Sequence, residues 1–202
     1  MSGTPDNRAG FRFQVICMEI IILRLGHRLP RDERISTHVA LVARAFGASA
    51  IAYTGQHDAG LELSVSRICA NWGGRTVSGS QFSVSYEKSA VPFIKARKRD
   101  GFTVVHLTMY GIPFMERIER IKSAGKVLIV VGSEQVPREI YELADLNIAV
   151  TSQPHSEVAA LAIALDRIME GKELSGMDFG GKISIEPSER GKKIVETPKA
   201  GQ

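Results

Sequence analysis

Three polar segments, each at or directly after the end of an apolar run, carry the residues of this chain that could bind a small ligand. They are residues 106–111 (HLTMYG), 132–137 (GSEQVP) and 150–157 (VTSQPHSE). Gly132 directly follows the run VLIVV, and a glycine lets a ligand approach the backbone closely. Pro154 is placed to open a helix, whose free amides could hold a carboxylate or an adenine acceptor. Any one segment alone is better explained by turns and a helix cap, but three together favour a ligand site.

Basic residues cluster at two other places in the chain. The first run holds Arg24, His27, Arg28, Arg31 and Arg34, and the second holds Lys95, Arg97, Lys98 and Arg99. Each run alone is more consistent with a solvated face than with a binding surface. The functional alternative is phosphate binding, because guanidinium groups fit phosphate oxygens bidentately. His38 and His155 have a suitable intrinsic pKa for a general base, although structural roles are open for both.

The apolar pattern alternates between strands and helices along most of the chain. We expect strands at 19–25, 50–53, 82–86, 102–109, 127–131 and 146–150, and helices at 36–46, 61–72, 92–99, 114–124, 137–143 and 154–170. We read residues 26–35 as a polar loop, and 75–86 and 183–195 as hairpins. This alternation predicts an α/β fold with a mostly parallel sheet. Ligands of such sheets bind beyond the carboxyl ends of the strands, where the three polar segments stand.

Composition limits the class of protein. The chain has 202 residues, a net charge of +4 and 44% hydrophobic residues, which suits one core with a small appendage. It contains neither a membrane-length apolar run nor an apolar secretory signal, so we expect a cytoplasmic protein. Cys17 and Cys69 indicate neither a disulfide nor a metal site. We expect residues 1–17 to be disordered, 18–171 to form the main domain and 172–202 to form a hairpin and tail.

Common nucleotide and metal signatures are missing from the sequence. No GxGxxG follows the first strand, which disfavours a nicotinamide-dependent oxidoreductase. Residues 176–182 fit GxxxxGK by letters, but Ile183 stands where Mg²⁺ coordination needs Ser or Thr. The metalloprotease, hydrolase and calcium-loop patterns are absent as well.

Four separated segments carry a family pattern. They are LRLGHRLPRDERISTHVALVARAFGA (23–48), VVHLTMYG (104–111), VVGSEQVP (130–137) and VTSQPHSEVAALA (150–162). In this order they resemble the archaeal tRNA cytidine-56 2′-O-methyltransferases of the SPOUT superfamily, and the resemblance runs from about Met18 to Val195. It implies an α/β trefoil knot, a homodimer, S-adenosylmethionine as methyl donor and tRNA as substrate. The alternative is a non-catalytic RNA- or nucleotide-binding α/β module.

The resemblance also implies which residues form the cofactor site, and no metal is required. The cofactor contacts would be Leu107, Gly132, Ser133, Glu134, Gln135, Val136, Val150, Thr151, Ser152, Gln153, Pro154, His155, Ser156 and Glu157. We expect tRNA to be bound by residues of the two basic runs, namely Arg28, Arg31, Lys95, Lys98 and Arg99.

One position departs from the pattern of the wider superfamily. Many members have an arginine six residues before the glycine that ends the first helix, where it is proposed to activate the ribose hydroxyl. Here that position is Leu41. A catalytic arginine must therefore come from elsewhere, and Arg24 is our first choice and Arg34 our second. Because arginine is normally protonated, it suits oxyanion stabilisation better than proton removal.

Overall fold

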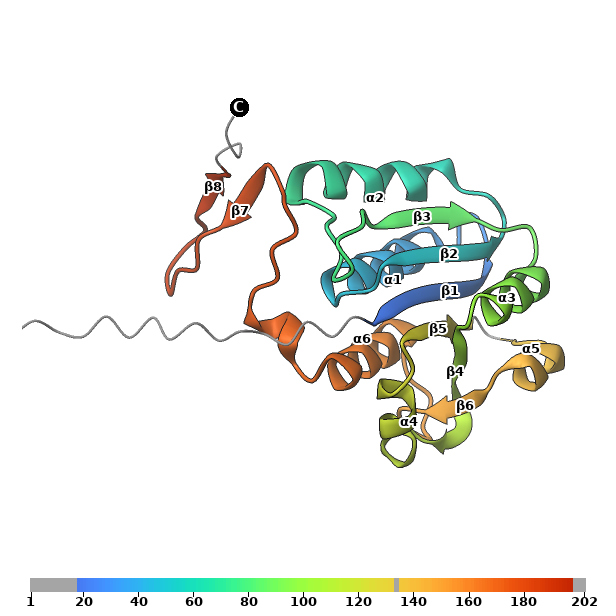
Figure 1. Ribbon diagram of the computed structural model, residues 1–202. Coiled ribbons are helices and arrows are strands. Elements are labelled where there is room, and N and C mark those ends of the chain that lie inside the picture. Colours follow the sequence, from blue (N-terminus) through green and yellow to red (C-terminus); the bar gives the residue numbers. More distant parts are fainter. Residues whose placement is uncertain (1–17, 133–134, 198–202) are drawn as a thin grey trace, which may run out of the picture.

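The computed structural model describes residues 18–132 and 135–197. The predictions for residues 1–17 and for Ser133 and Glu134 lie outside these ranges. Six strands form one sheet in which every pair of neighbours is parallel, as the sequence predicts. In spatial order they are β3 (Ser83–Tyr86), β2 (Ala50–Gly55), β1 (Glu19–His27), β5 (Lys126–Val131), β4 (Thr103–Pro113) and β6 (Leu146–Ala149) (Figure 1).

The two central strands have the most continuous apolar sequence. In β1 the run from Ile20 to Leu23 is buried, and in β5 the run from Val127 to Val131 is buried. A parallel strand covered by helices on both faces buries every side chain, which explains why these runs do not alternate with polar residues.

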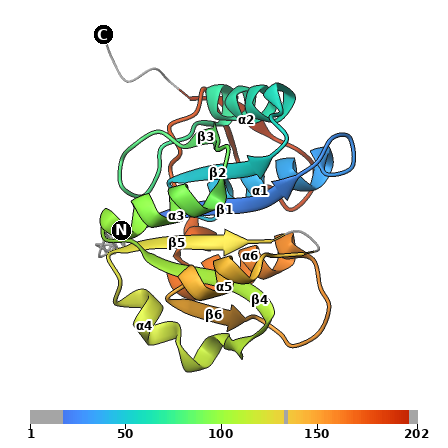
Figure 2. The ribbon, with the colours of Figure 1, turned by 90° about the vertical axis from the view of Figure 1, so that its right-hand side faces the viewer.

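Helices cover both faces of the sheet. Buried residues of α1 (Glu33–Ala45), α2 (Ala59–Trp72), α4 (Ile118–Lys122) and α6 (Glu157–Met169) share one apolar cluster. Ile94 of α3 (Ala90–Arg99) and Ile140 of α5 (Arg138–Leu143) belong to a second cluster on the opposite face. Figure 2 shows α3 and α5 in front of the sheet. The connections therefore return each strand to the same direction, as a parallel sheet requires.

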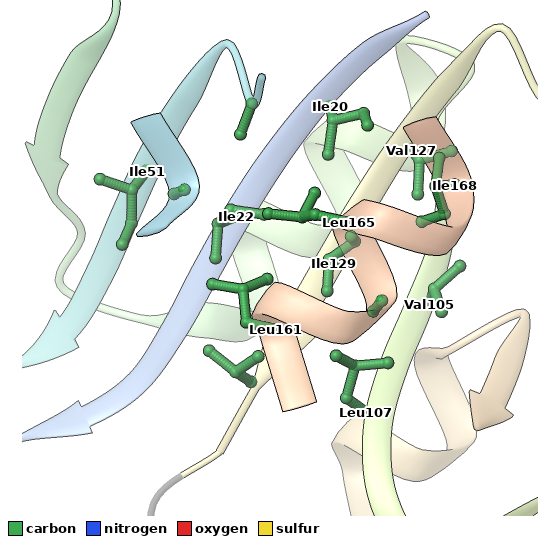
Figure 3. Packing of buried hydrophobic residues seen from close by; sticks show 14 of the residues in the cluster. Ile20, Ile22, Ile51, Val105, Leu107, Val127, Ile129, Leu161, Leu165 and Ile168 are labelled. Carbon is green, nitrogen blue, oxygen red and sulfur yellow. The ribbon is translucent and has the colours of Figure 1, made fainter. Parts of the chain in front are cut away.

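Helix α6 packs across the middle of the sheet. Leu161, Leu165 and Ile168 lie over Ile22 and Ile129 of the central strands (Figure 3). Leu161 and Leu165 are fully buried, so truncating either to Ala should cost about 2–5 kcal/mol. This packing holds the start of α6 at the carboxyl edge of the sheet.

Several element boundaries differ from the sequence-based expectation. Helix α1 begins at Glu33, within the predicted polar loop. The sequence pattern missed this start because Glu33 and Arg34 are exposed and carry no apolar periodicity. Helix α6 begins at Glu157 instead of near Pro154, since Ser156 is the N-cap and its Oγ accepts from the amide of Val158. The predicted helix over 114–124 is divided into a 3₁₀ turn, η1 (Phe114–Glu116), and α4.

The predicted hairpin over residues 75–86 is present only at its turn, where the Phe82 amide donates to the Gly74 carbonyl and the Thr76 amide to the Ser80 carbonyl. A single antiparallel bridge joins Arg75 and Gln81, and β3 pairs in parallel with β2. A half-exposed edge strand alternates apolar and polar residues whether its neighbour is parallel or antiparallel, so the pattern could not identify the partner.

The C-terminal hairpin is present. Strands β7 (Ile183–Ile185) and β8 (Ile194–Glu196) are antiparallel, after a short 3₁₀ turn, η2 (Lys172–Ser175). The segment before β7 joins the main domain through a bridge between Gly73 and Gly180. Arg44 strengthens this junction, because its Nε donates to the Gly73 carbonyl at 2.8 Å and its guanidinium lies over the Phe179 ring.

Candidate functional site

A cavity of about 410 Å³ opens at the carboxyl edge of the sheet, where β4, β5 and β6 end. These three strands are neighbours in the sheet, so the loops that follow them meet. The cavity is lined by His106, Leu107, Thr108, Met109, Tyr110, Val131, Gly132, Val136, Tyr141, Val150, Pro154, His155, Glu157 and Ala160. Its volume lies within the range of small-molecule sites, roughly 300–1,000 Å³.

A bulge in β4 forms one wall of the cavity. Leu107 and Ile112 both pair with Ile148 of β6, so the four residues between them leave the ladder. Gly111 lies against β6, and a Cβ built on it would be 2.5 Å from the Ile148 amide nitrogen. The bulge turns Thr108, Met109 and Tyr110 toward the cavity, where the hydroxyls of Thr108 and Tyr141 are 3.1 Å apart.

Gly132 makes room for the side chain of Val136 at the end of β5. A Cβ at this position would collide with Cγ2 of Val136, which also lines the cavity. The glycine therefore brings an apolar side chain over the end of β5 and leaves the backbone accessible to a ligand.

The third wall is the start of α6 and the loop before it. His155 Nδ1 is 2.7 Å from the Gln153 carbonyl oxygen, so the ring is held with Nδ1 as the donor. Glu157 is the first residue of the helix and faces the same cavity.

Glu157 forms an ion pair with a buried arginine of the central strand. Arg24 is 1% exposed, and its Nη2 donates to Glu157 Oε1 at 3.1 Å. Its Nη1 donates to the Leu25 carbonyl, and Asp32 Oδ2 lies 3.9 Å from Nη2. Burial raises the pKa of the Glu157 carboxyl above its ordinary value, and the Arg24 charge partly opposes that effect. The pair thus sets a carboxylate at the cavity wall with a buried cation behind it.

His106 is held behind the wall by a hydrogen-bonded network. Its Nδ1 is 2.9 Å from Asn147 Oδ1, and Asn147 Nδ2 donates to the Tyr141 carbonyl. These bonds assign the ring proton to Nδ1. Burial lowers the pKa of His106, so the ring is neutral near pH 7.

The structure brings together many of the cofactor residues expected from the sequence. Those on the cavity wall are Leu107, Gly132, Val136, Val150, Pro154, His155 and Glu157. Gln135, Thr151, Ser152, Gln153 and Ser156 belong to the same loops but do not line it. Seven wall residues were not among the expected cofactor contacts: His106, Thr108, Met109, Tyr110, Val131, Tyr141 and Ala160. His106 belongs to the first of the three polar segments, so the sequence offered a reason to include it. Tyr141 and Ala160 lie within helices, and no sequence motif marks them as ligand contacts.

The basic residues expected to bind RNA are divided between the two ends of the sheet. Arg28 and Arg31 belong to the loop after β1, and Arg34, the second catalytic candidate, belongs to the start of α1. This loop and helix start lie at the carboxyl edge of the sheet (Figure 2), where the cavity opens. Helix α3 instead runs toward the amino end of β4, which carries Lys98 and Arg99 away from the cavity.

The exposure of these residues also differs. Arg31 and Arg34 are exposed, and Arg28 is half-buried with its Nε 3.1 Å from Asp32 Oδ2. Lys98 Nζ is 2.7 Å from Asp145 Oδ1 and also donates to the Leu143 carbonyl, so it joins α3 to the α5–β6 turn. Lys95 lies 3.9 Å from Glu139 of α5.

Residues 18–132 and 135–197 contain neither a metal-binding cluster nor a membrane-spanning helix. No cluster of three or more His, Cys, Asp or Glu side chains is arranged to hold a metal ion there. None of the helices in those ranges is both long enough and apolar enough to span a bilayer.

Comparison with known sequences gives consistent matches. The model of a family described as tRNA ribose 2′-O-methyltransferase, aTrm56, matches residues 78–195. A tRNA (cytidine(56)-2′-O)-methyltransferase of Archaeoglobus fulgidus is 52% identical over 178 residues, which cover 88% of this chain and 99% of that protein. An enzyme of the same name from Thermococcus kodakarensis is 48% identical, with 88% of this chain and 97% of that protein covered.

Solved structures share the fold at lower identity. A TrmH/SpoU tRNA modifying enzyme of A. aeolicus has a TM-score of 0.55 and 17% identity, covering 80% of this chain and 81% of that one. An AdoMet-bound rRNA methyltransferase from Sinorhizobium meliloti has a TM-score of 0.54 and 19% identity, covering 76% and 56%. At these identities the similarity concerns the fold.

Proposed function

This chain belongs to the tRNA ribose 2′-O-methyltransferase family, and we propose that it transfers the methyl group of S-adenosylmethionine to the 2′-hydroxyl of cytidine 56 in tRNA. The observation that carries the proposal is the single cavity formed by the ends of β4, β5 and β6. It lies where open α/β sheets bind their ligands. Because its substrate is tRNA, we place the enzyme in the cytoplasm.

The cavity fits the proposed cofactor in its lining and charge. Leu107, Val131, Val136, Val150 and Ala160 offer apolar walls to an adenine ring. Gly132 admits the ligand close to the backbone, and the Glu157 carboxylate faces a cavity that would hold a sulfonium cation. Of the residues given to the cofactor from the sequence, we retain those on the wall as direct contacts and the others as parts of the same loops.

When bound, S-adenosylmethionine supplies a methyl group that is already activated by its positive sulfur. The protein then has two tasks, to align the ribose oxygen with that methyl group and to remove the hydroxyl proton. The rigid ends of three buried strands perform the alignment. Because a ribose hydroxyl is a weak acid, a group near the reacting oxygen must accept its proton or stabilise the developing oxyanion.

The two arginines proposed for catalysis have different access. Arg24 is buried and paired with Glu157, so it would influence the ribose only by holding that carboxylate in place. Arg34 is exposed at the start of α1 and is the one that can reach a bound RNA phosphate. For tRNA binding we rank Arg28 and Arg31 ahead of Lys95, Lys98 and Arg99. Lys98 and Arg99 lie at the far end of α3, and Lys95 is paired with Glu139 of α5.

Family membership and shared fold also support a trefoil knot, in which α6 passes under a loop of the chain. The loops that would form it follow β5 and β6, and the carboxyl ends of these two strands lie at the same edge of the sheet.

A homodimer is supported by exposed apolar side chains at the cavity wall, in η1 and on α6. Tyr110 is 76% exposed, Met115 is 64% exposed and Ile163 of α6 is 47% exposed. Met115 and Arg167 line one shallow depression, and Ile163 lies one turn before Arg167 on α6. A second copy covering this area would remove apolar surface from water.

Ribose-methylation mapping tests the function directly. Unmodified tRNA incubated with the protein and S-adenosylmethionine should gain a 2′-O-methyl group at cytidine 56. A thermal-shift titration separates the alternative, because S-adenosylhomocysteine stabilises a transferase. A protein that binds tRNA but neither cofactor form would be a non-catalytic RNA-binding module.

A further inference from the structure

We propose that the Glu157 carboxylate accepts the proton of the ribose 2′-hydroxyl during methyl transfer, and that Arg24 is a positioning residue that holds this carboxylate. The inference rests on the proposed function. It assigns the activation of the ribose hydroxyl, for which the sequence offered Arg24 and Arg34, to Glu157.

Glu157 is the one carboxylate among the described residues of the cavity wall. Its side chain is 17% exposed, so it is accessible to a ligand but largely enclosed. It is the first residue of α6, whose apolar face is anchored across β1 and β5. A group held in this way keeps a fixed position relative to the bound methyl donor, which general base catalysis requires.

Arg24 cannot itself contact the RNA. Its side chain is 1% exposed in the middle of the sheet. One guanidinium nitrogen donates to Glu157 Oε1 at 3.1 Å and another to the Leu25 carbonyl at 3.2 Å. The bond from Arg24 occupies Oε1 and leaves Oε2 to accept the hydroxyl proton. Burying a charged side chain is costly unless it is paired, so this arginine and glutamate depend on each other.

Two histidines also line the cavity and could compete for this role. His106 Nε2 is buried without solvent exposure, so it is not available to the ribose. His155 is exposed, and a backbone carbonyl two residues earlier fixes its Nδ1. His155 lacks the enclosed, paired setting of Glu157, and the experiment below distinguishes the two.

The surroundings of Glu157 make it a stronger proton acceptor than a free glutamate. Burial raises the pKa of this carboxyl, whereas Arg24 keeps the ionised form accessible. The charged and titratable groups around it are Arg24 of β1, Asp32 before α1, His155 in the preceding loop, and His106, Tyr110 and Tyr141 of the cavity wall.

The proposed step balances. The ribose oxygen forms a bond to the methyl carbon while the carbon–sulfur bond breaks. The electron pair of that bond returns to sulfur and gives neutral S-adenosylhomocysteine. The hydroxyl proton moves to Glu157, which becomes a carboxylic acid and then releases the proton to water.

The test is single-turnover methyl transfer to unmodified tRNA by the full-length protein, measured from about pH 5 to about pH 9, with S-adenosylhomocysteine affinity measured separately. Glu157→Gln should lower the transfer rate by roughly 100-fold or more and remove the acid limb of the pH profile. S-adenosylhomocysteine lacks the positive sulfur that the Glu157 carboxylate faces, so its Kd should stay within about threefold of the wild-type value. Arg24→Lys should lower the rate without weakening tRNA binding.

Matched variants make the outcome decisive. Glu142→Gln removes a 59%-exposed carboxylate outside the cavity and should change nothing. Glu157→Asp keeps a charge beside Arg24, so it should fold even if the Gln variant does not, and should react slowly with the acid limb retained.

Three results would overturn the proposal. They are a Glu157→Gln enzyme that keeps its rate and acid limb, a loss of S-adenosylhomocysteine affinity as large as the loss of rate, and an acid limb that disappears only in His155→Gln. Wild-type protein that binds S-adenosylhomocysteine but does not methylate tRNA would instead contradict the proposed function.

Discussion

Replacing Gly111 with Ala tests whether the β4 bulge shapes the cofactor cavity. The new Cβ would lie 2.5 Å from the Ile148 amide nitrogen and 2.6 Å from the Asn147 carbonyl oxygen. Both are backbone atoms of β6, so no side-chain rotation relieves the contact. Ordinary contacts begin at 3.4 Å, so β4 and β6 must separate by about 0.9 Å.

Overpacking of this kind costs about 1–3 kcal/mol, which for a chain of this length lowers Tm by roughly 2–12 °C. The displaced bulge carries Thr108 and Tyr110 of the cavity wall, and a misplacement near 1 Å can lower a reaction rate by about 100-fold. We therefore expect Gly111→Ala to lower both Tm and the rate of methyl transfer.

Differential scanning fluorimetry and a methyl-transfer assay measure the two effects. Gly125→Ala is the control, because a Cβ there meets no atom within 4 Å. If Gly111→Ala matched this control in Tm and in activity, the close approach of β4 and β6 would not constrain the site.

Three other predictions concern pH, RNA binding and assembly. Burial lowers the pKa of His106, so its contribution to stability is present above its unfolded pKa of about 6.5 and is lost as pH falls toward the folded value. In urea unfolding, the free energy of unfolding of His106→Gln should therefore fall less on acidification than that of the wild type. An equal fall in both proteins would contradict this. Lys98→Ala should reduce the free energy of unfolding by roughly 1 kcal/mol, through loss of its contact with Asp145, and leave tRNA affinity unaltered. Arg31→Ala should reduce the slope of log affinity against log salt concentration by the amount expected for about one phosphate contact. The reverse pattern would place the RNA on α3. Ile163→Glu should convert a dimer to a monomer in sedimentation equilibrium, and an unchanged mass would exclude this face of α6 from the interface.

Local patterns sufficed for the elements with strong periodicity. The uninterrupted apolar run of β5 predicted a strand buried on both faces, and that is confirmed. The polar segments after β4, β5 and β6 were expected at one edge because parallel strands all end on the same side. A parallel α/β sheet and a ligand site at its carboxyl edge therefore follow from sequence alone.

Strand partners and strand register needed the tertiary structure. The alternation in β3 is the same for a hairpin and for a parallel edge strand, so its pairing with β2 depends on contacts remote in sequence. The shift between Leu107 and Ile112 in β4 likewise arises from packing against β6.

The roles of charged residues depended most on the fold. In sequence, Arg24 belongs to a basic run and Glu157 to a polar loop, yet they pair 133 positions apart at the cavity wall. Lys98 belongs to a basic run as well, but its ammonium group joins two elements of the scaffold. Residue type and spacing determined which chemistry this chain carries. Only the folded chain decided which charges are buried, because burial and pairing arise when distant segments come into contact.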